Sequence, residues 1–187
     1  MRRCALGLLL FVSAPAQAAE LLREFDLGGA YLADRALLFE GRAGASYGGF
    51  GIEAWAFRLH DRGFVHPLDA LHTTLAVTAS SHAEGYVLAG LVGVSYTRAS
   101  AAGSSYTGPV APDVGGRFLW DVQPGWRVQL EGRLSMYEDG YGFIGGVAAH
   151  KRLTSDVSAT LGWRVFWTTQ EGSDDVVKNG IMLGLAY

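Results

Sequence analysis

The chain has 187 residues, of which 26 are glycine, only 5 are proline and 12 % are aromatic, and its formal net charge is −3. This mild acidity argues against nucleic acid or an anionic membrane surface as an electrostatic partner. After the first eighteen residues no run approaches the roughly 18 consecutive apolar residues of a transmembrane helix. Alternation of apolar and polar residues, the pattern of β-strands, prevails instead.

The first eighteen residues have the features of a secretory signal peptide. Arg2 and Arg3 form a basic start, residues 6–12 are apolar, and Ala16-Gln17-Ala18 is a small-x-small cleavage site. Removal of the two arginines but of no acid leaves 13 basic and 18 acidic residues, a net charge of −5. Cys4 is removed as well, so the mature chain can form no disulfide and has no thiol chemistry.

The remainder, residues 19–187, is predicted to be one all-β domain of ten strands. Alternation is clearest over 126–136, where large apolar residues separate Arg127, Gln129, Glu131 and Arg133. Each predicted segment has about the 9 to 11 residues that a tilted strand needs to cross a bilayer. The ten segments are 23–33, 37–47, 50–60, 71–79, 86–97, 114–122, 126–136, 141–151, 157–168 and 178–187.

The lengths of the connections alternate along the chain. Those after the second, fourth, sixth and eighth segments are short, whereas residues 61–70, 98–113 and 169–177 form longer ones. Short periplasmic turns and longer extracellular loops are typical of an antiparallel up-and-down transmembrane β-barrel with both termini periplasmic. We therefore predict such a barrel with ten strands; closure with eight or twelve strands is the alternative.

Charge is sorted to one side of nearly every predicted strand, as a polar barrel interior requires. The 50–60 segment is the exception, because Glu53 shares its phase with apolar residues while Arg58 and His60 lie on the other phase; a bulge is one way to switch that phase. The uncharged phase includes Phe25, Leu27, Tyr31, Phe39, Tyr47, Leu75, Val77, Leu88, Val92, Val94, Trp120, Leu161 and Trp163. An interior polar network is predicted from Glu40, Arg42, Arg117, Asp121, Arg127, Glu131, Arg133 and Arg164.

The predicted network is close to electrically neutral. A ten-stranded barrel is much narrower than the porins that leave an aqueous channel, and buried charges need partners. These points favour a plug of ion pairs that stabilises the barrel. The alternative is a narrow channel for small solutes, lined by the arginines.

Histidine and aspartate gather between two predicted strands. His60, His66, Asp69 and His72 are the residue types of a general base or a metal site, and they are the candidates for catalysis at the extracellular rim. The spacing of the histidines matches no compact metal-ligand motif. We therefore predict a solvated loop without metal or cofactor; a membrane-embedded hydrolase with its site at the rim is the alternative.

The last segment carries an assembly signal. Ile181, Leu183, Leu185 and Tyr187 share one face, and the chain ends on the aromatic residue. This strand resembles the closing strand of small bacterial outer-membrane β-barrel proteins, whose terminal aromatic is recognised by the barrel-assembly machinery. The resemblance implies a Gram-negative outer membrane and contact with its lipids and lipopolysaccharide. Omptin proteases are similar in strand number and in acid and histidine pairs at the rim, but none of their catalytic residues can be matched here.

These features together predict an integral outer-membrane barrel that acts as a non-enzymatic envelope or surface-interaction protein. Porin-like conduction and hydrolysis at the rim are the two alternative functions. No motif specifies a protein partner.

Overall fold

The computed structural model describes residues 22–62, 68–101, 104–108, 110–138, 140–170 and 176–187, so the predicted signal peptide lies outside the described residues. Ten long strands form the architecture: β1 (Leu22–Leu32), β2 (Ala36–Tyr47), β3 (Phe50–Asp61), β4 (Leu68–Ala83), β5 (Tyr86–Ala101), β7 (Ala111–Gln123), β8 (Trp126–Tyr137), β9 (Gly140–Arg152), β10 (Ser158–Gln170) and β11 (Val176–Ala186). A short strand, β6 (Ser104–Thr107), pairs with β5, and a 3-10 turn, Ala33–Arg35, joins β1 to β2.

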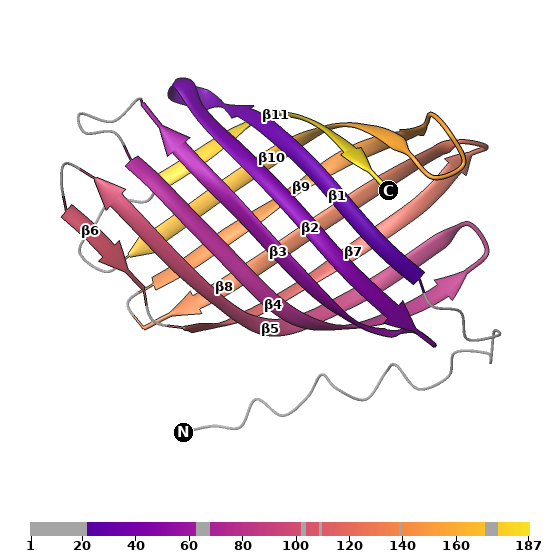
Figure 1. The fold of residues 1–187 in the computed structure, drawn as a ribbon, viewed down its shortest axis with the longest axis horizontal. Coiled ribbons are helices and arrows are strands. Elements are labelled where there is room, and N and C mark those ends of the chain that lie inside the picture. The colour runs from indigo at the N-terminus through magenta and orange to yellow at the C-terminus, as the bar shows by residue number, and fades with distance from the viewer. Residues whose placement is uncertain (1–21, 63–67, 102–103, 109, 139, 171–175) are drawn as a thin grey trace.

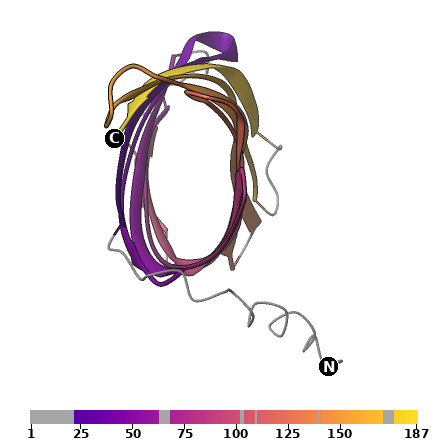
Figure 2. The ribbon, with the colours of Figure 1, turned by 90° about the vertical axis from the view of Figure 1, so that its right-hand side faces the viewer.

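The ten long strands close into an antiparallel up-and-down barrel. Each pairs with the next long strand in the sequence, and β1 pairs with β11 (Figure 1). At this seam the amide of Phe25 donates to the carbonyl of Tyr187 at 3.1 Å, and the amide of Tyr187 donates back at 2.8 Å. Seen along the barrel, the strands form an oval ring (Figure 2). The predicted ten-stranded barrel is therefore confirmed, and the alternatives of eight or twelve strands are wrong.

The two ends of the barrel differ. One end of the barrel holds the tight turns after β2, β4 and β7, the start of β1 and the end of β11, and we call it the turn end (Figure 1). We call the opposite end of the barrel the loop end. The tight turns contain Gly48, Gly49, Gly85 and Gly125, each with φ between 58° and 84°. Such positive φ values match the twist of two-residue hairpins and favour glycine.

Strands β4 and β5 are longer than the sequence predicted, at 16 residues each. Their pairing runs without interruption from Leu68 and Ala101 to Ala83 and Tyr86. Residues 80–83 were predicted to be part of a turn, but they continue the ladder until Glu84 and Gly85 turn the chain. The predicted turn and both flanking connections are consequently shorter.

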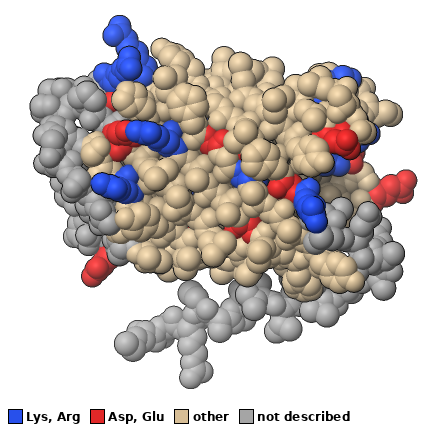
Figure 3. Space-filling model, viewed as in Figure 1, with Lys and Arg blue, Asp and Glu red and all other residues tan. Residues whose placement is uncertain are grey.

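The outer surface of the barrel is an apolar belt. The uncharged phase predicted to face lipid is exposed on the barrel wall, for example Leu27, Phe39, Leu75, Val77 and Leu161, each more than half exposed. One face is predominantly uncharged, with Lys, Arg, Asp and Glu gathered mainly toward the two ends (Figure 3). Soluble monomers rarely expose contiguous apolar patches beyond a few hundred Å², so this belt indicates a surface that water does not cover. No helix among the described residues is long and apolar enough to cross a membrane.

Strand β3 is oriented by its neighbours rather than by a bulge. Its pairing with β2 and β4 is continuous, and Glu53, Trp55, Phe57 and Leu59 are all buried in the lumen. The outward phase carries Phe50 and Ile52 near the turn end and Arg58 and His60 near the loop end. The phase of the 50–60 segment, which the sequence left open, is therefore settled: its large apolar residues point into the lumen, where they form a core near the loop end.

Candidate functional site

The middle of the lumen is filled by a network of buried ion pairs. Glu131 of β8 accepts hydrogen bonds from Arg42 and, at 3.1 Å, from Arg117, and one of its oxygens lies 3.6 Å from Arg164. The amide of Gln129 donates to the same carboxylate at 2.8 Å. The side chain of Glu131 is only 2 % exposed, so these contacts replace the water that a carboxylate would otherwise bind.

Glu53 of β3 is a second centre of this network. It accepts from Arg117 and forms an ion pair with Arg133, while Arg42 approaches to 3.6 Å. The guanidinium of Arg133 also lies 4.8 Å from the centre of the Trp55 ring, a cation–π contact. Glu53 therefore links charges on β2, β7 and β8 at once.

The remaining members extend the network to the opposite wall. Arg164 of β10 donates to Glu40 of β2 at 2.5 Å, and Arg42 donates to the half-buried Asp26 at 3.2 Å. Four arginines thus face four carboxylates: Arg42, Arg117, Arg133 and Arg164 with Asp26, Glu40, Glu53 and Glu131. We call these eight residues the ionic plug. Each of these ions has a partner of opposite sign, as burial requires, and the buried Asp113 lies 3.7 Å from Arg133 at the edge of the plug.

The structure assigns the predicted network residues to two places. Glu40, Arg42, Arg117, Glu131, Arg133 and Arg164 lie in the ionic plug, whereas Asp121 and Arg127 form a separate pair of 2.7 Å that is exposed at the turn end. Glu53 was missed as a network member because the phase of its strand was unresolved. Glu53 alternates in phase with Trp55, Phe57 and Leu59. This pattern would have indicated an inward Glu53 if a buried aromatic core at one end of the lumen had been expected.

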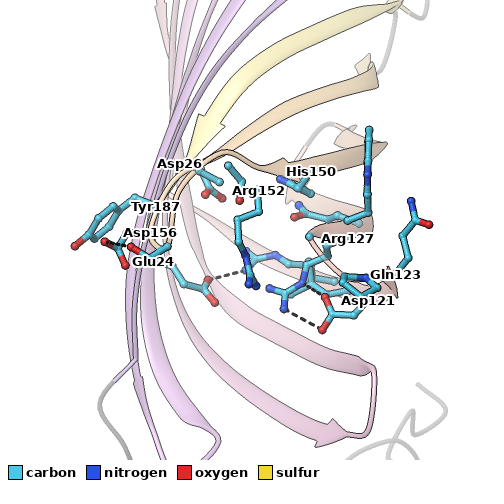
Figure 4. Close-up of a pocket in the computed structure, with 18 residues that line it drawn as sticks. Glu24, Asp26, Asp121, Gln123, Arg127, His150, Arg152, Asp156 and Tyr187 are labelled. Atoms are coloured by element: carbon cyan, nitrogen blue, oxygen red, sulfur yellow. Dashed lines mark hydrogen bonds and ion pairs between the residues drawn. The ribbon is translucent and has the colours of Figure 1, made fainter.

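A charged cavity of about 510 Å³ opens on the turn-end side of the plug (Figure 4). The residues that line it include acids and bases from β1, β7, β8 and β9, among them Glu24, Asp121, Arg127, His150 and Arg152. Glu24 accepts from Arg117 of the plug at 3.2 Å, which ties the rim of this cavity to its floor. The mixture of both charges gives the cavity no strong preference for anions or cations.

A second cavity of about 290 Å³ lies on the loop-end side of the plug, and we call it the aromatic cavity. Its walls are formed by Phe57, Leu59, Phe143, Ile144 and Phe166, together with small residues from β4, β5 and β9. It shares no lining residue with the charged cavity. A buried pair between Lys178 and Asp61, 3.1 Å apart, also lies in this half of the barrel but does not line the cavity.

One polar cluster borders the aromatic cavity. Thr97 Oγ1 lies 2.8 Å from His72 Nδ1 and 2.9 Å from the Tyr137 hydroxyl, which in turn is 3.4 Å from His72 Nδ1. The other ring nitrogen of His72 lies 3.3 Å from Thr74 Oγ1. Three strands, β4, β5 and β8, contribute to this cluster. No pattern in the sequence indicates this cluster, because Thr97 and Tyr137 are 25 and 65 residues away from His72.

The predicted catalytic candidates do not share one location. His60 and Asp69 are paired in register on the outside of β3 and β4, where Asp69 accepts two hydrogen bonds from Arg58 at 2.9 and 2.5 Å. His72 instead points inward and lines the aromatic cavity, while His66 lies outside the described residues. Among the described residues, no group of three or more His, Cys, Asp or Glu could hold a metal ion.

Comparison with known proteins supports the fold class. No family model matches the sequence, and no curated protein matches it significantly. The outer membrane protease OmpT from Escherichia coli is 12 % identical with a TM-score of 0.50, over 90 % of this chain and 93 % of that one. Neisserial surface protein A is 13 % identical with a TM-score of 0.45, over 91 % and 98 % of the two chains.

An anion-selective porin from Comamonas acidovorans is 11 % identical with a TM-score of 0.43, over 81 % of this chain and 48 % of the porin. The present chain thus spans about half the length of that porin. At the level of fold, the expected resemblance to bacterial outer-membrane barrels is confirmed.

Proposed function

We propose that the chain is an integral outer-membrane protein that acts at the cell surface as a non-enzymatic envelope or surface-interaction protein, with a lumen closed to ions. Both termini lie in the periplasm, and the apolar belt contacts outer-membrane lipids and lipopolysaccharide. Tyr187 is the residue that the barrel-assembly machinery recognises.

The belt and its borders support insertion in a membrane. Exposed aromatic residues lie near both ends of the belt, with Tyr47 and Tyr187 at the turn end and Tyr31 and Tyr96 toward the loop end. Girdles of aromatic side chains on either side of an apolar band are the arrangement of transmembrane barrels at the two membrane interfaces.

The ionic plug is the observation that carries the proposal of a closed lumen. Arg133, Glu53 and Glu131 have side chains that are 1 to 3 % exposed, so water does not reach them from either cavity. A conducting pore would instead hydrate the charges that line it. The plug therefore favours a structural role for the arginines over a narrow channel.

The geometry also favours a non-enzymatic role. Of the candidate residues, His60 and Asp69 are neighbours on the outer surface, where Asp69 is bound by Arg58, and the barrel wall separates both from His72. The similarity to OmpT concerns the fold and transfers no catalytic residue.

Conductance across a planar bilayer tests the closed lumen. We expect the purified wild-type barrel to give no steady conductance steps. The double variant Arg42→Ala/Glu131→Ala removes one cation and one anion from the plug, so it keeps the charge balanced while opening space, and it should conduct. The matched control is Asp121→Ala/Arg127→Ala, which removes an exposed pair and should stay closed. Steady ion conductance by the wild type would overturn the proposal.

A further inference from the structure

We propose that the aromatic cavity binds a small, neutral, planar aromatic molecule that carries one hydroxyl group. This goes beyond the proposed function, which requires only a barrel with a closed lumen. The inference rests on the size of the cavity, on the rings in its wall, and on the single polar cluster at its border.

The volume sets the size of the ligand. An engineered apolar cavity of about 150 Å³ holds benzene. The aromatic cavity, at about 290 Å³, has close to twice that volume and so accommodates two fused rings or one substituted ring. Binding pockets of drug-sized ligands start at about 300 Å³, so larger molecules would not be enclosed.

The wall favours a planar ring. Phe57 stacks on the ring of His72 with centroids 4.9 Å apart and meets Phe166 edge to face at 5.8 Å. Trp55 lies 5.2 Å from Phe57 on the side of the plug. Aromatic pairs prefer such stacked and edge-on arrangements, so a planar ligand would extend an aromatic cluster that already exists.

The polar cluster favours one hydroxyl group. The Tyr137 hydroxyl shares one hydrogen bond with Thr97 and, whichever of the two hydroxyls donates, keeps a site for a further hydrogen bond. A ligand hydroxyl can both donate and accept, so it can fill that site at the border of the cavity. A ligand without a polar group would leave the site without a partner, which lowers its affinity.

Charge near the cavity excludes an anionic ligand. Glu138 is the charged residue among those that line the cavity, and it is exposed at the loop end. The guanidinium of Arg133, on the side of the plug, is already engaged by Glu53, by Asp113 and by the face of Trp55. An aromatic carboxylate would therefore meet an acid and no free base, whereas a neutral phenol meets neither penalty.

Binding to the purified full-length barrel in lipid nanodiscs tests the inference. The probes are 2-naphthol, naphthalene and 2-naphthoate, measured by equilibrium dialysis against empty nanodiscs of the same lipid, so that partition into lipid is subtracted. We expect saturable binding of 2-naphthol at one site, weaker binding of naphthalene and none of 2-naphthoate.

Two variants locate the site. Ala99→Phe fills the cavity from β5, where Ala99 faces Ala70, and should abolish binding of both neutral probes. Tyr137→Phe removes one hydroxyl and should weaken 2-naphthol binding about three- to tenfold without weakening that of naphthalene. Tyr47→Phe, on the exposed outer surface at the turn end, is the matched control and should bind like the wild type.

Heat-modifiable gel mobility establishes that each variant is folded before it is compared. Absence of saturable binding to the wild type would overturn the inference, and so would unchanged binding to folded Ala99→Phe. Equal loss of 2-naphthol affinity in Tyr137→Phe and Tyr47→Phe would overturn the role of the polar cluster. None of these results bears on conductance, so the closed lumen is tested separately.

Discussion

Arg42 on β2 and Glu131 on β8 form an ion pair across the lumen, although 89 residues separate them in the sequence. The two strands are not neighbours in the sheet, in which each strand is hydrogen-bonded only to the strands beside it. The ionic plug therefore connects walls of the barrel that the backbone does not connect. The plug stabilises contacts across the lumen, whereas the backbone hydrogen bonds stabilise contacts between adjacent strands.

Replacement of Glu131 by Gln should destabilise the barrel strongly. The amide has nearly the same size but no charge, so Arg42, Arg117 and Arg164 lose a shared counter-ion in a site that water does not reach. Removal of one partner from a buried ion pair costs about 3–5 kcal/mol. The measurement is the free energy of unfolding in urea, with the folded barrel followed by its heat-modifiable gel mobility.

The control for this experiment is Asp121→Asn, the same chemical change in an exposed pair. Its pair with Arg127 is solvated, so the loss should be about 0–1 kcal/mol. Equal effects of the two substitutions would contradict a structural role for the plug.

Leu130 and Glu131 are adjacent on β8 but should react with different reagents. Leu130 is 50 % exposed on the outer wall between Phe118 and Val147, whereas Glu131 points into the lumen. Residues 5–187 contain no cysteine, so single cysteines can be placed at either position. In a bilayer, a lipid-confined maleimide should label Leu130→Cys and leave Glu131→Cys unmodified; equal labelling would contradict the outward phase of β8.

The seam between β1 and β11 depends on Gly180. A Cβ atom at this position would overlap the carbonyl oxygen of Tyr31 and come within 2.6 Å of Leu32 Cα. Gly180→Ala should therefore push the closing strands apart and cost about 1–3 kcal/mol, the usual range for overpacking. Gly90→Ala on β5 is the control, because its Cβ would meet nothing within 4 Å. Equal urea midpoints for the two variants would show that the seam adapts.

Most of the fold was predictable because its signals are local. Alternation indicates the phase of a strand from that strand alone, and short connections between alternating segments indicate the tight turns. This is why most of the strand phases and the two ends of the barrel followed from the sequence. The phase of β3 could not be predicted, because its outward-facing Arg58 and His60 lie near the loop end, where the wall need not be apolar.

The interior site was predictable only in part. Inward charges were identified, but their partners depend on the stagger between strands that are distant in the sequence, as for Arg117 and Glu53. The division of the lumen into an ionic plug and an aromatic cavity depends on the height of each residue along the barrel. Read from the turn end to the loop end, β3 shows that order directly: Glu53 first, then Trp55, Phe57 and Leu59.

The proposed orientation can be tested with two further cysteines. Glu138 is exposed at the loop end and Ser155 is exposed at the turn end, in the connection between β9 and β10. If the loop end faces the outside, a membrane-impermeant maleimide on intact cells should label Glu138→Cys and not Ser155→Cys. Both should be labelled after the outer membrane is permeabilised. The reverse pattern on intact cells would place both termini outside.

Tyr187 should matter for assembly more than for the stability of the finished barrel. Its backbone closes the seam with Phe25, but its side chain is 65 % exposed and contributes little to packing. Tyr187→Ala keeps the backbone hydrogen bonds while it removes the aromatic group that the assembly machinery is proposed to recognise. We expect the amount of folded protein in the outer membrane to fall several-fold, whereas the urea midpoint of the barrel that does fold should shift by no more than that of the control variant.

The control is Tyr47→Ala, which replaces an equally exposed tyrosine at the same end of the barrel. It should assemble normally, since it lies on an internal strand. Normal assembly of Tyr187→Ala, or equal losses for both variants, would contradict a role for the terminal aromatic as a signal.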